Sequence, residues 1–221
     1  MSNVESAFVP SVRITSTWQL ALTWIGASVI AVPFGVLLHE VGHVLVYVAF
    51  GFPDVVLHYN SATYSAERTF WQFISRGNIA AAAATIPLWK VGIATAAGIL
   101  VTCITAFVCC LFASRKSPHP LVIALGVFAP VRFLSGIPVL TAWLSGRPVR
   151  AGTDEAHLAA LTGIPLIVLV FAGLLFVAVV WSWMIGRIRR DHGWVSLGGL
   201  VSGLALGIVV YFWMIGPRLL P

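Results

Sequence analysis

The chain has 221 residues, of which 59% are hydrophobic and only 9% are charged, and its mean hydropathy is +0.98. Soluble domains carry roughly 25% charged residues, so this composition excludes an ordinary soluble protein. The net charge of +6 comes from basic residues that we expect in short loops beside apolar segments, which indicates membrane orientation and lipid headgroup contact rather than nucleic-acid binding. We therefore predict an all-α polytopic membrane protein in contact with the lipid bilayer, with a single domain over residues 1–221.

Residues 1–16 form a polar N-terminal tail, and a first apolar run extends from about Trp18 to Phe52. As one helix, a run of roughly 35 residues would span about 50 Å, which exceeds the hydrocarbon core of a bilayer. The run leaves no room for a turn between two antiparallel crossings. The sequence therefore predicts one long element that is kinked or broken near Pro33 and Gly35.

The rest of the chain alternates between polar connections and apolar runs. Residues 51–54 end the first run, and the β-branched and aromatic residues of 55–66 predict a short β-hairpin or a re-entrant segment. Residues 67–90 combine tryptophan and basic residues with an alanine-rich piece, which is typical of an interfacial segment. Four later runs cover about 91–113, 121–144, 164–185 and 194–215. Their lengths predict about five to six transmembrane helices in all.

The basic residues indicate how these spans are oriented. Five crossings place Arg13, Arg115–Lys116 and the cluster Arg187–Arg190 on one side, which the positive-inside rule makes cytoplasmic. Residues 51–90 and 145–163 then share the opposite side, and the second half of the first apolar run points there too. We expect a multi-pass integral protein of the cell membrane.

The second half of the first apolar run contains the sequence His-Glu-Val-Gly-His from residue 39 to residue 43, an HExxH motif. Residues four apart share one face of a helix, so His39 and His43 can present two imidazoles to one zinc ion. Glu40 lies beside that position and could take a proton from a zinc-bound water. An acidic residue costs about 2.5–3.5 kcal/mol at the centre of a membrane helix, and a bound metal would compensate this cost. The alternative is a polar helix face that is turned into a bundle and matches HExxH by accident.

A catalytic zinc site uses three protein ligands and leaves one open position for water. We predict Asp154 as the third ligand, because it lies in a polar segment at the membrane edge on the side towards which the motif points. Glu155 and His157 are the alternative ligands. Capping is a competing role for this region, since Thr153 or Asp154 would cap a short helix over 155–162.

Arg132 is the other residue that is costly inside a membrane, because it lies about 12 residues into its predicted span. It could pair with Asp154 or Glu155, or it could stabilise an oxyanion. We favour the alternative of a structural ion pair, or of a kink at Pro130 that admits water. Arg132, Glu155 and His157 are thus the residues for which we predict supporting or substrate-contacting roles.

The sequence HEVGH within an apolar helix resembles the motif of the site-2 protease family, whose members are membrane-embedded zinc metalloproteases. The run Ala96–Thr102 resembles the small-residue segment that this family carries on a later transmembrane helix, with Ile99 where the family has proline. Asp154 follows Pro148 and takes the place of the family's third ligand. Glu155 follows it where the family has glycine.

This resemblance implies a zinc-dependent endopeptidase with Zn²⁺ as its cofactor and Glu40 as general base and then proton donor. The implied substrate is a transmembrane or membrane-associated protein, which must unwind locally before it is cut. The 55–64 segment could pair with the unwound substrate as an added strand. Two alternatives remain: a transporter that uses an intramembrane metal or proton site, and a sensing scaffold with a structural or regulatory metal.

Overall fold

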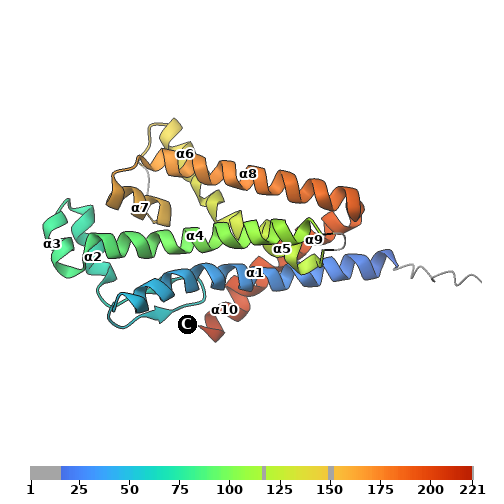
Figure 1. Cartoon of the computed structure of the whole chain (residues 1–221), viewed down its shortest axis with the longest axis horizontal. Coiled ribbons are helices and arrows are strands. Elements are labelled where there is room, and N and C mark those ends of the chain that lie inside the picture. Colours follow the sequence, from blue (N-terminus) through green and yellow to red (C-terminus); the bar gives the residue numbers. More distant parts are fainter. Residues whose placement is uncertain (1–15, 116–117, 149–151, 221) are drawn as a thin grey trace, which may run out of the picture.

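The computed structural model describes residues 16–115, 118–148 and 152–220 (Figure 1). Within these residues, five helices are long and apolar enough to cross a membrane, and β-structure is confined to two strands of two residues each. The predicted all-α polytopic membrane fold is therefore confirmed. The five spans are α1 (Thr17–Ala49), α4 (Leu88–Ala113), Pro120–Leu144, α8 (Leu166–Asp191) and Gly193–Leu219. The predicted N-terminal tail, apart from Ser16, lies outside the described residues.

Helix α1 is the long first element that the sequence predicts. It begins with a capping box, in which Ser16 Oγ accepts a hydrogen bond from Gln19 N and the Gln19 side chain accepts one from Ser16 N. The helix continues through Pro33, so of the two expected outcomes, a kink or a break, the break does not occur. Proline removes one backbone hydrogen bond, which a membrane helix tolerates when neighbouring helices pack around it. The ring of Phe128 lies where a side chain at Gly35 would stand, so this glycine permits close packing.

The third and fifth spans are irregular. The third span comprises α5 (Pro120–Phe128), the 3-10 helix η1 (Ala129–Ser135) and α6 (Gly136–Leu144). The fifth span comprises α9 (Gly193–Val209), the π-helix η2 (Val210–Ile215) and α10 (Gly216–Leu219). Stretches of 3-10 or π-helix within a longer helix often mark functional positions. Arg132 lies in η1.

Helix α8 extends further than the sequence predicts, to Asp191 instead of Ile185. Arg187, Arg189 and Arg190 therefore lie in its last turns and not in a loop, which corrects the prediction. Cations near a helix C-terminus interact favourably with the helix dipole. Nε of Arg187 also lies 2.7 Å from Oδ2 of Asp191, one turn along the helix. Both effects stabilise helical structure in this basic stretch.

The elements outside the spans gather at one end of the helix bundle (Figure 1). These elements are β1 (Val56–Leu57), β2 (Ala62–Thr63), α2 (Glu67–Ser75), α3 (Ile79–Thr85) and α7 (Asp154–Thr162). The two strands pair antiparallel, so the predicted hairpin near 55–66 is confirmed. Helix α1 ends beside them, whereas the turn between α8 and α9 lies at the other end (Figure 1). Residues 51–90 and 152–163 therefore lie at the same end of the molecule.

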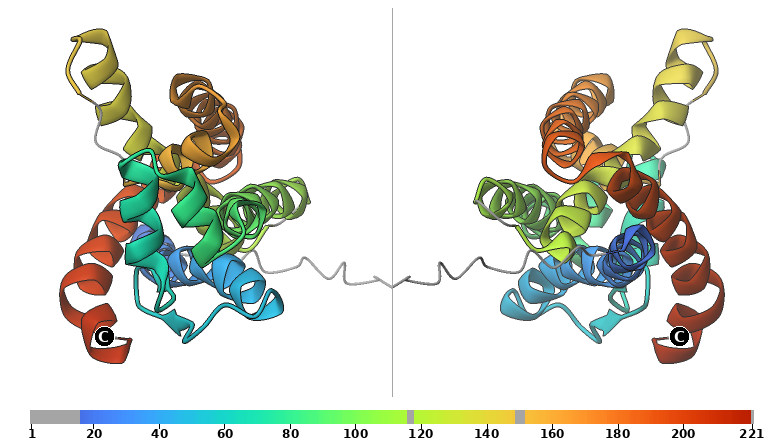
Figure 2. Two further views of the ribbon diagram at one scale, coloured as in Figure 1. Left: turned by 90° about the vertical axis from the view of Figure 1, so that its left-hand side faces the viewer. Right: turned by 90° about the vertical axis from the view of Figure 1, so that its right-hand side faces the viewer.

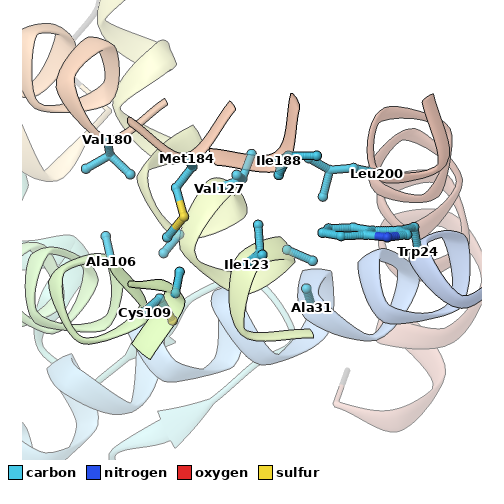
Figure 3. Close-up of a cluster of buried hydrophobic side chains, with 13 residues drawn as sticks. Trp24, Ala31, Ala106, Cys109, Ile123, Val127, Val180, Met184, Ile188 and Leu200 are labelled. Carbon is cyan, nitrogen blue, oxygen red and sulfur yellow. The ribbon is translucent and has the colours of Figure 1, made fainter. Parts of the chain in front are cut away.

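Two kinds of contact hold the spans together. Gly199, Gly203 and Gly207 let α9 approach α1, because an added Cβ at each would meet backbone or side-chain atoms of α1. Small residues spaced by four are typical of closely packed membrane helices. An apolar cluster joins α1, α4, α5, α8 and α9, and its members Trp24 and Met184 are fully buried (Figure 3). The end-on view shows α2 and α3 across the end of the bundle (Figure 2, left).

Candidate metal centre

Helix α1 presents His39 and His43 on one face, towards the interior of the protein. Both side chains are buried, and their Nε2 atoms lie 3.1 Å apart. The HExxH spacing produces this arrangement, because residues four apart lie one above the other on a helix. The rings meet edge to face at 89°, so the two imidazoles do not stack on each other. Their Nε2 atoms can therefore approach one shared ion.

The third predicted ligand comes from α7. Oγ1 of Thr153 accepts a hydrogen bond from Ala156 N and caps the helix. Asp154 is the first residue of the helix and not its cap, so its carboxylate is free to turn towards α1. Its Oδ2 lies 3.1 Å from Nε2 of His39 and 3.2 Å from Nε2 of His43. The structure thus brings all three expected ligands together, with ligand atoms within 4.8 Å of one another.

Helix α4 fixes the orientation of the imidazoles. Nδ1 of His43 donates a hydrogen bond of 2.7 Å to the backbone carbonyl of Ala94. Because a carbonyl only accepts, the neutral ring carries its proton on Nδ1, and the lone pair lies on Nε2, which faces Asp154. Nδ1 of His39 lies 3.0 Å from Oγ1 of Thr102, a hydroxyl that can donate or accept and that helps to hold the ring in place. Partners of this kind orient metal-binding histidines and fix their tautomers.

Helices α1 and α4 approach closely here because each contributes a glycine. A Cβ on Gly98 would collide with Nε2 of His43 and would lie 2.5 Å from Cε1 of His39. A Cβ on Gly42 would lie 3.0 Å from a backbone carbonyl oxygen of α4. The run Ala96–Thr102 is therefore the part of α4 that makes room for the imidazole rings.

Glu40 is buried beside the three converging ligand atoms. Its Oε1 lies 4.0 Å from Nε2 of His39, so the carboxylate is next to the cluster without belonging to it. From this position it can accept a proton from a water molecule held at the site. The role of general base requires this geometry.

Arg132 reaches the cluster from η1. Its Nη1 lies 2.7 Å from Oδ2 of Asp154 and contacts both ring nitrogens of His39. Its Nη2 lies 3.5 Å from Oε1 of Glu155, whose side chain is only 7% exposed. Both of the acids that the sequence offered as partners therefore contact this arginine. Glu155 faces Arg132 and is not among the ligand atoms that converge in the described residues.

A cavity of about 580 Å³ opens onto the cluster. Its size falls within the range of ligand-binding sites, roughly 300–1,000 Å³. Glu40 and Arg132 line it together with the three expected ligands. Tyr47 of α1 and two residues of α2, Glu67 and Trp71, form further parts of its wall. The cavity therefore connects the cluster to elements outside the membrane spans.

His157 lines the same cavity but does not belong to the three converging ligands. Its ring stacks on the ring of Trp71, with centroids 3.9 Å apart and an angle of 16°. Burial lowers the pKa of His157 and thereby favours the neutral ring. This contact joins α2 to α7, the helix that carries Asp154.

The charges around α7 keep Asp154 ionised. Burial alone would raise its pKa, but hydrogen bonds with His39 and His43 and the charge of Arg132 hold the pKa well below its usual range. Burial raises the pKa of Glu67, another acid in the wall of the cavity. Asp154 is thus available as the anion that metal ligation requires.

Sequence reasoning missed the groups that support the histidines and the wall formed by α2. Gly98 lies in a small-residue run, which is a visible signal, although the run does not reveal contact with the imidazoles. No motif marks Thr102 as a partner of His39. The stack of Trp71 on His157 likewise depends on how α2 and α7 meet in three dimensions.

The donor set fits a zinc ion. Two imidazole nitrogens and one carboxylate oxygen match the ligands of catalytic zinc sites, which leave a further position for water. Comparison of the chain with protein-family models, curated proteins and solved structures gives no match. Function is therefore inferred from the residues of the site.

Proposed function

We propose that the protein is a zinc-dependent endopeptidase of the cell membrane, similar to the site-2 protease family, that cleaves transmembrane or membrane-associated proteins. One observation carries this proposal. His39, His43 and Asp154 bring ligand atoms within 4.8 Å of one another, and Oε1 of Glu40 lies 4.0 Å from Nε2 of His39. Three ligands, a general base and an adjoining cavity are the parts that a metallopeptidase needs.

Each of these residues has a distinct task in peptide hydrolysis. His39, His43 and Asp154 would hold the ion, which when bound supplies a Lewis acid for the scissile carbonyl and for water. The carboxylate of Glu40 takes a proton from the attacking water and delivers it to the nitrogen of the leaving amine. The carbonyl of Ala94 keeps the His43 ring in place meanwhile.

The cavity explains how a peptide bond would reach Glu40. Asn60, Ser61 and Ala62 of the hairpin line the cavity, at the end of the bundle where α2 and α7 also lie. Peptide bonds in a helix are shielded, whereas an extended segment exposes them. A substrate that unwinds at the membrane edge could add to the hairpin as a strand, with main-chain hydrogen bonds supplying affinity.

The variant Glu40→Gln tests this proposal, because it removes the base and leaves the three ligands in place. Wild type and variant are purified in nanodiscs, their zinc is measured by mass spectrometry, and cleavage of single-span membrane proteins is followed. We expect equal zinc in both proteins and a loss of cleavage by about 100-fold or more in the variant. Asp191→Asn, at the far end of α8, is the matched acid-to-amide control and should cleave like wild type.

Three results would contradict the proposal. Cleavage that survives Glu40→Gln would show that another group, or a contaminating protease, performs the reaction. A folded, zinc-loaded wild type that moves ions or protons and cuts no substrate would instead support the transporter alternative. Zinc without turnover or transport would support a scaffold with a structural metal.

A further inference from the structure

The guanidinium of Arg132 lies where the expected ligand atoms converge. Nη1 is 2.7 Å from Oδ2 of Asp154 and contacts His39 at both ring nitrogens, with 2.8 Å to Nδ1. Zinc is bound by such oxygen and nitrogen atoms at about 2.0–2.2 Å. A divalent ion and Nη1 therefore cannot both lie against the same two atoms. The arginine and the metal compete for one set of donors.

Glu155 offers the guanidinium a second place nearby. Nη2 of Arg132 and Oε1 of Glu155 are 3.5 Å apart, longer than a good charged hydrogen bond. Nε of Arg132 and Oε1 of Glu155 are both buried and have no hydrogen-bond partner among the described residues. A buried polar atom without a partner is costly. Turning the guanidinium away from Asp154 and onto Glu155 would satisfy both atoms.

We propose that Arg132 is a displaceable cation of the metal centre. In the arrangement that the structure shows, its guanidinium neutralises Asp154 and packs against His39. When a divalent ion takes that position, the guanidinium turns onto Glu155 and stays beside the ion. This proposal rests on the metal site of the proposed function but not on peptide hydrolysis.

Such an exchange would solve a problem of the metal-free protein. Asp154 contacts both histidines and the neighbouring Glu155 is buried beside Arg132, and buried acids without a counter-charge are strongly unfavourable. Arg132 supplies that charge from within the chain. The consequence is a weaker apparent metal affinity, because the ion binds only the fraction of molecules whose site the guanidinium has left.

The test is the dissociation constant for Zn²⁺, measured by competition with a fluorescent chelator on full-length protein in nanodiscs. Arg132→Gln removes the competing charge, so zinc should bind about tenfold tighter or more. Arg132→Lys keeps the charge and should stay within about threefold of wild type. Arg187→Gln removes an arginine paired with an aspartate far from the site and should leave the constant unchanged.

Glu155→Gln should have the opposite effect, because it removes the place to which the guanidinium turns. Zinc should then bind about tenfold more weakly. In the Arg132→Gln background, Glu155→Gln should change the dissociation constant for zinc by less than about threefold, since Glu155 acts through the arginine. This double-mutant cycle distinguishes exchange from a general effect of charge.

Weaker or unchanged zinc binding in Arg132→Gln would overturn the proposal, as would an undiminished effect of Glu155→Gln in that background. If Arg132→Gln does not fold, Glu155→Gln is the test by itself. An unchanged dissociation constant for zinc in Glu155→Gln then overturns the proposal. These outcomes are separate from those for the proposed function. The exchange fails while the function stands if zinc-loaded protein cleaves but Arg132→Gln binds zinc like wild type. The proposed function fails while the exchange stands if the zinc affinities shift as expected and no substrate is cut.

Discussion

The two histidines depend on α4 as much as on the helix that carries them. Ala94 and Thr102 hold the Nδ1 atoms from α4, and Gly98 leaves the space in which both rings lie. A metal site gains affinity when its ligands are held in the binding geometry before the ion arrives. The packing of α1 against α4 therefore belongs to the chemistry of the site.

Gly98→Ala should lower zinc affinity, because the new Cβ would collide with both imidazoles. We expect a loss of about tenfold or more, measured by chelator competition. Gly92→Ala is the matched control, since it lies on the same helix and its Cβ would meet nothing within 4 Å. Both changes raise helix propensity by about 1 kcal/mol, so a difference between them reports the contact with the histidines. Equal affinities for the two variants would show that the rings can move aside.

Some features of the site follow from local sequence and others do not. The HExxH spacing alone predicts that His39 and His43 share a helix face. The prediction that Asp154 is the third ligand also depends on which segments lie on the same side of the membrane, and Glu155 and His157 remained alternatives. The structure separates them by their contacts, because Glu155 faces Arg132 and His157 stacks on Trp71.

At the scale of elements, the site combines the long helix α1 with the short helix α7 and the β1–β2 hairpin. Helix α7 brings Asp154 to the histidines, and the stack of His157 on Trp71 ties α7 to α2. The hairpin adds Asn60, Ser61 and Ala62 to the wall of the cavity. These elements lie outside the spans, so the site combines residues of the spans with residues of the elements at one end of the bundle.

If a substrate adds to the hairpin, Ala62→Pro should reduce cleavage about tenfold or more, because proline removes a backbone donor from the strand that lines the cavity. Val56→Pro, on the other strand and 45% exposed, is the control for disturbing the hairpin itself. Zinc content should stay at the wild-type value in both. Full cleavage by Ala62→Pro would remove strand addition from the mechanism.

Element boundaries were predicted best where composition changes abruptly. The end of α1 near Gly51 and the hairpin follow turn residues that the sequence displays, and Gly51 has a φ of +69°. The extension of α8 through its arginines was missed, because a charged run after an apolar one is typical of a loop. The Arg187–Asp191 pair, which supports helix there, is visible only in the structure. The 3-10 helix around Arg132 also carries no periodic signal of its own.

At the scale of the whole molecule, the spans separate two ends of different character. The hairpin, α2 and α7, which contribute residues to the wall of the cavity, lie at one end, and the C-terminal end of α8, which carries its arginines, lies at the other (Figure 1). Composition predicted this polytopic fold because long apolar runs have few alternatives in a bilayer. It could not predict how α9 packs on α1, since the glycines at 199, 203 and 207 specify close approach but not the partner helix.

The positive-inside rule predicts that the arginine end faces the cytoplasm. Single cysteines are introduced as Gly77→Cys at the cavity end and Arg189→Cys at the other end, after Cys103, Cys109 and Cys110 have been replaced by alanine. A membrane-impermeant maleimide should label Gly77→Cys in intact cells and Arg189→Cys only after permeabilisation. The reversed pattern would place the cavity in the cytoplasm. Labelling of both cysteines from outside would contradict the odd number of membrane spans that lies between residue 77 and residue 189.

The metal content of the purified protein tests the central claim most directly. Mass spectrometry after dialysis against zinc should find about one ion per chain in wild type. His39→Ala, His43→Ala and Asp154→Ala should each retain less than about a tenth of that amount, because each removes one of three ligands. Asp191→Ala should bind like wild type. A folded wild type that holds no metal, or ligand variants that keep theirs, would contradict the account.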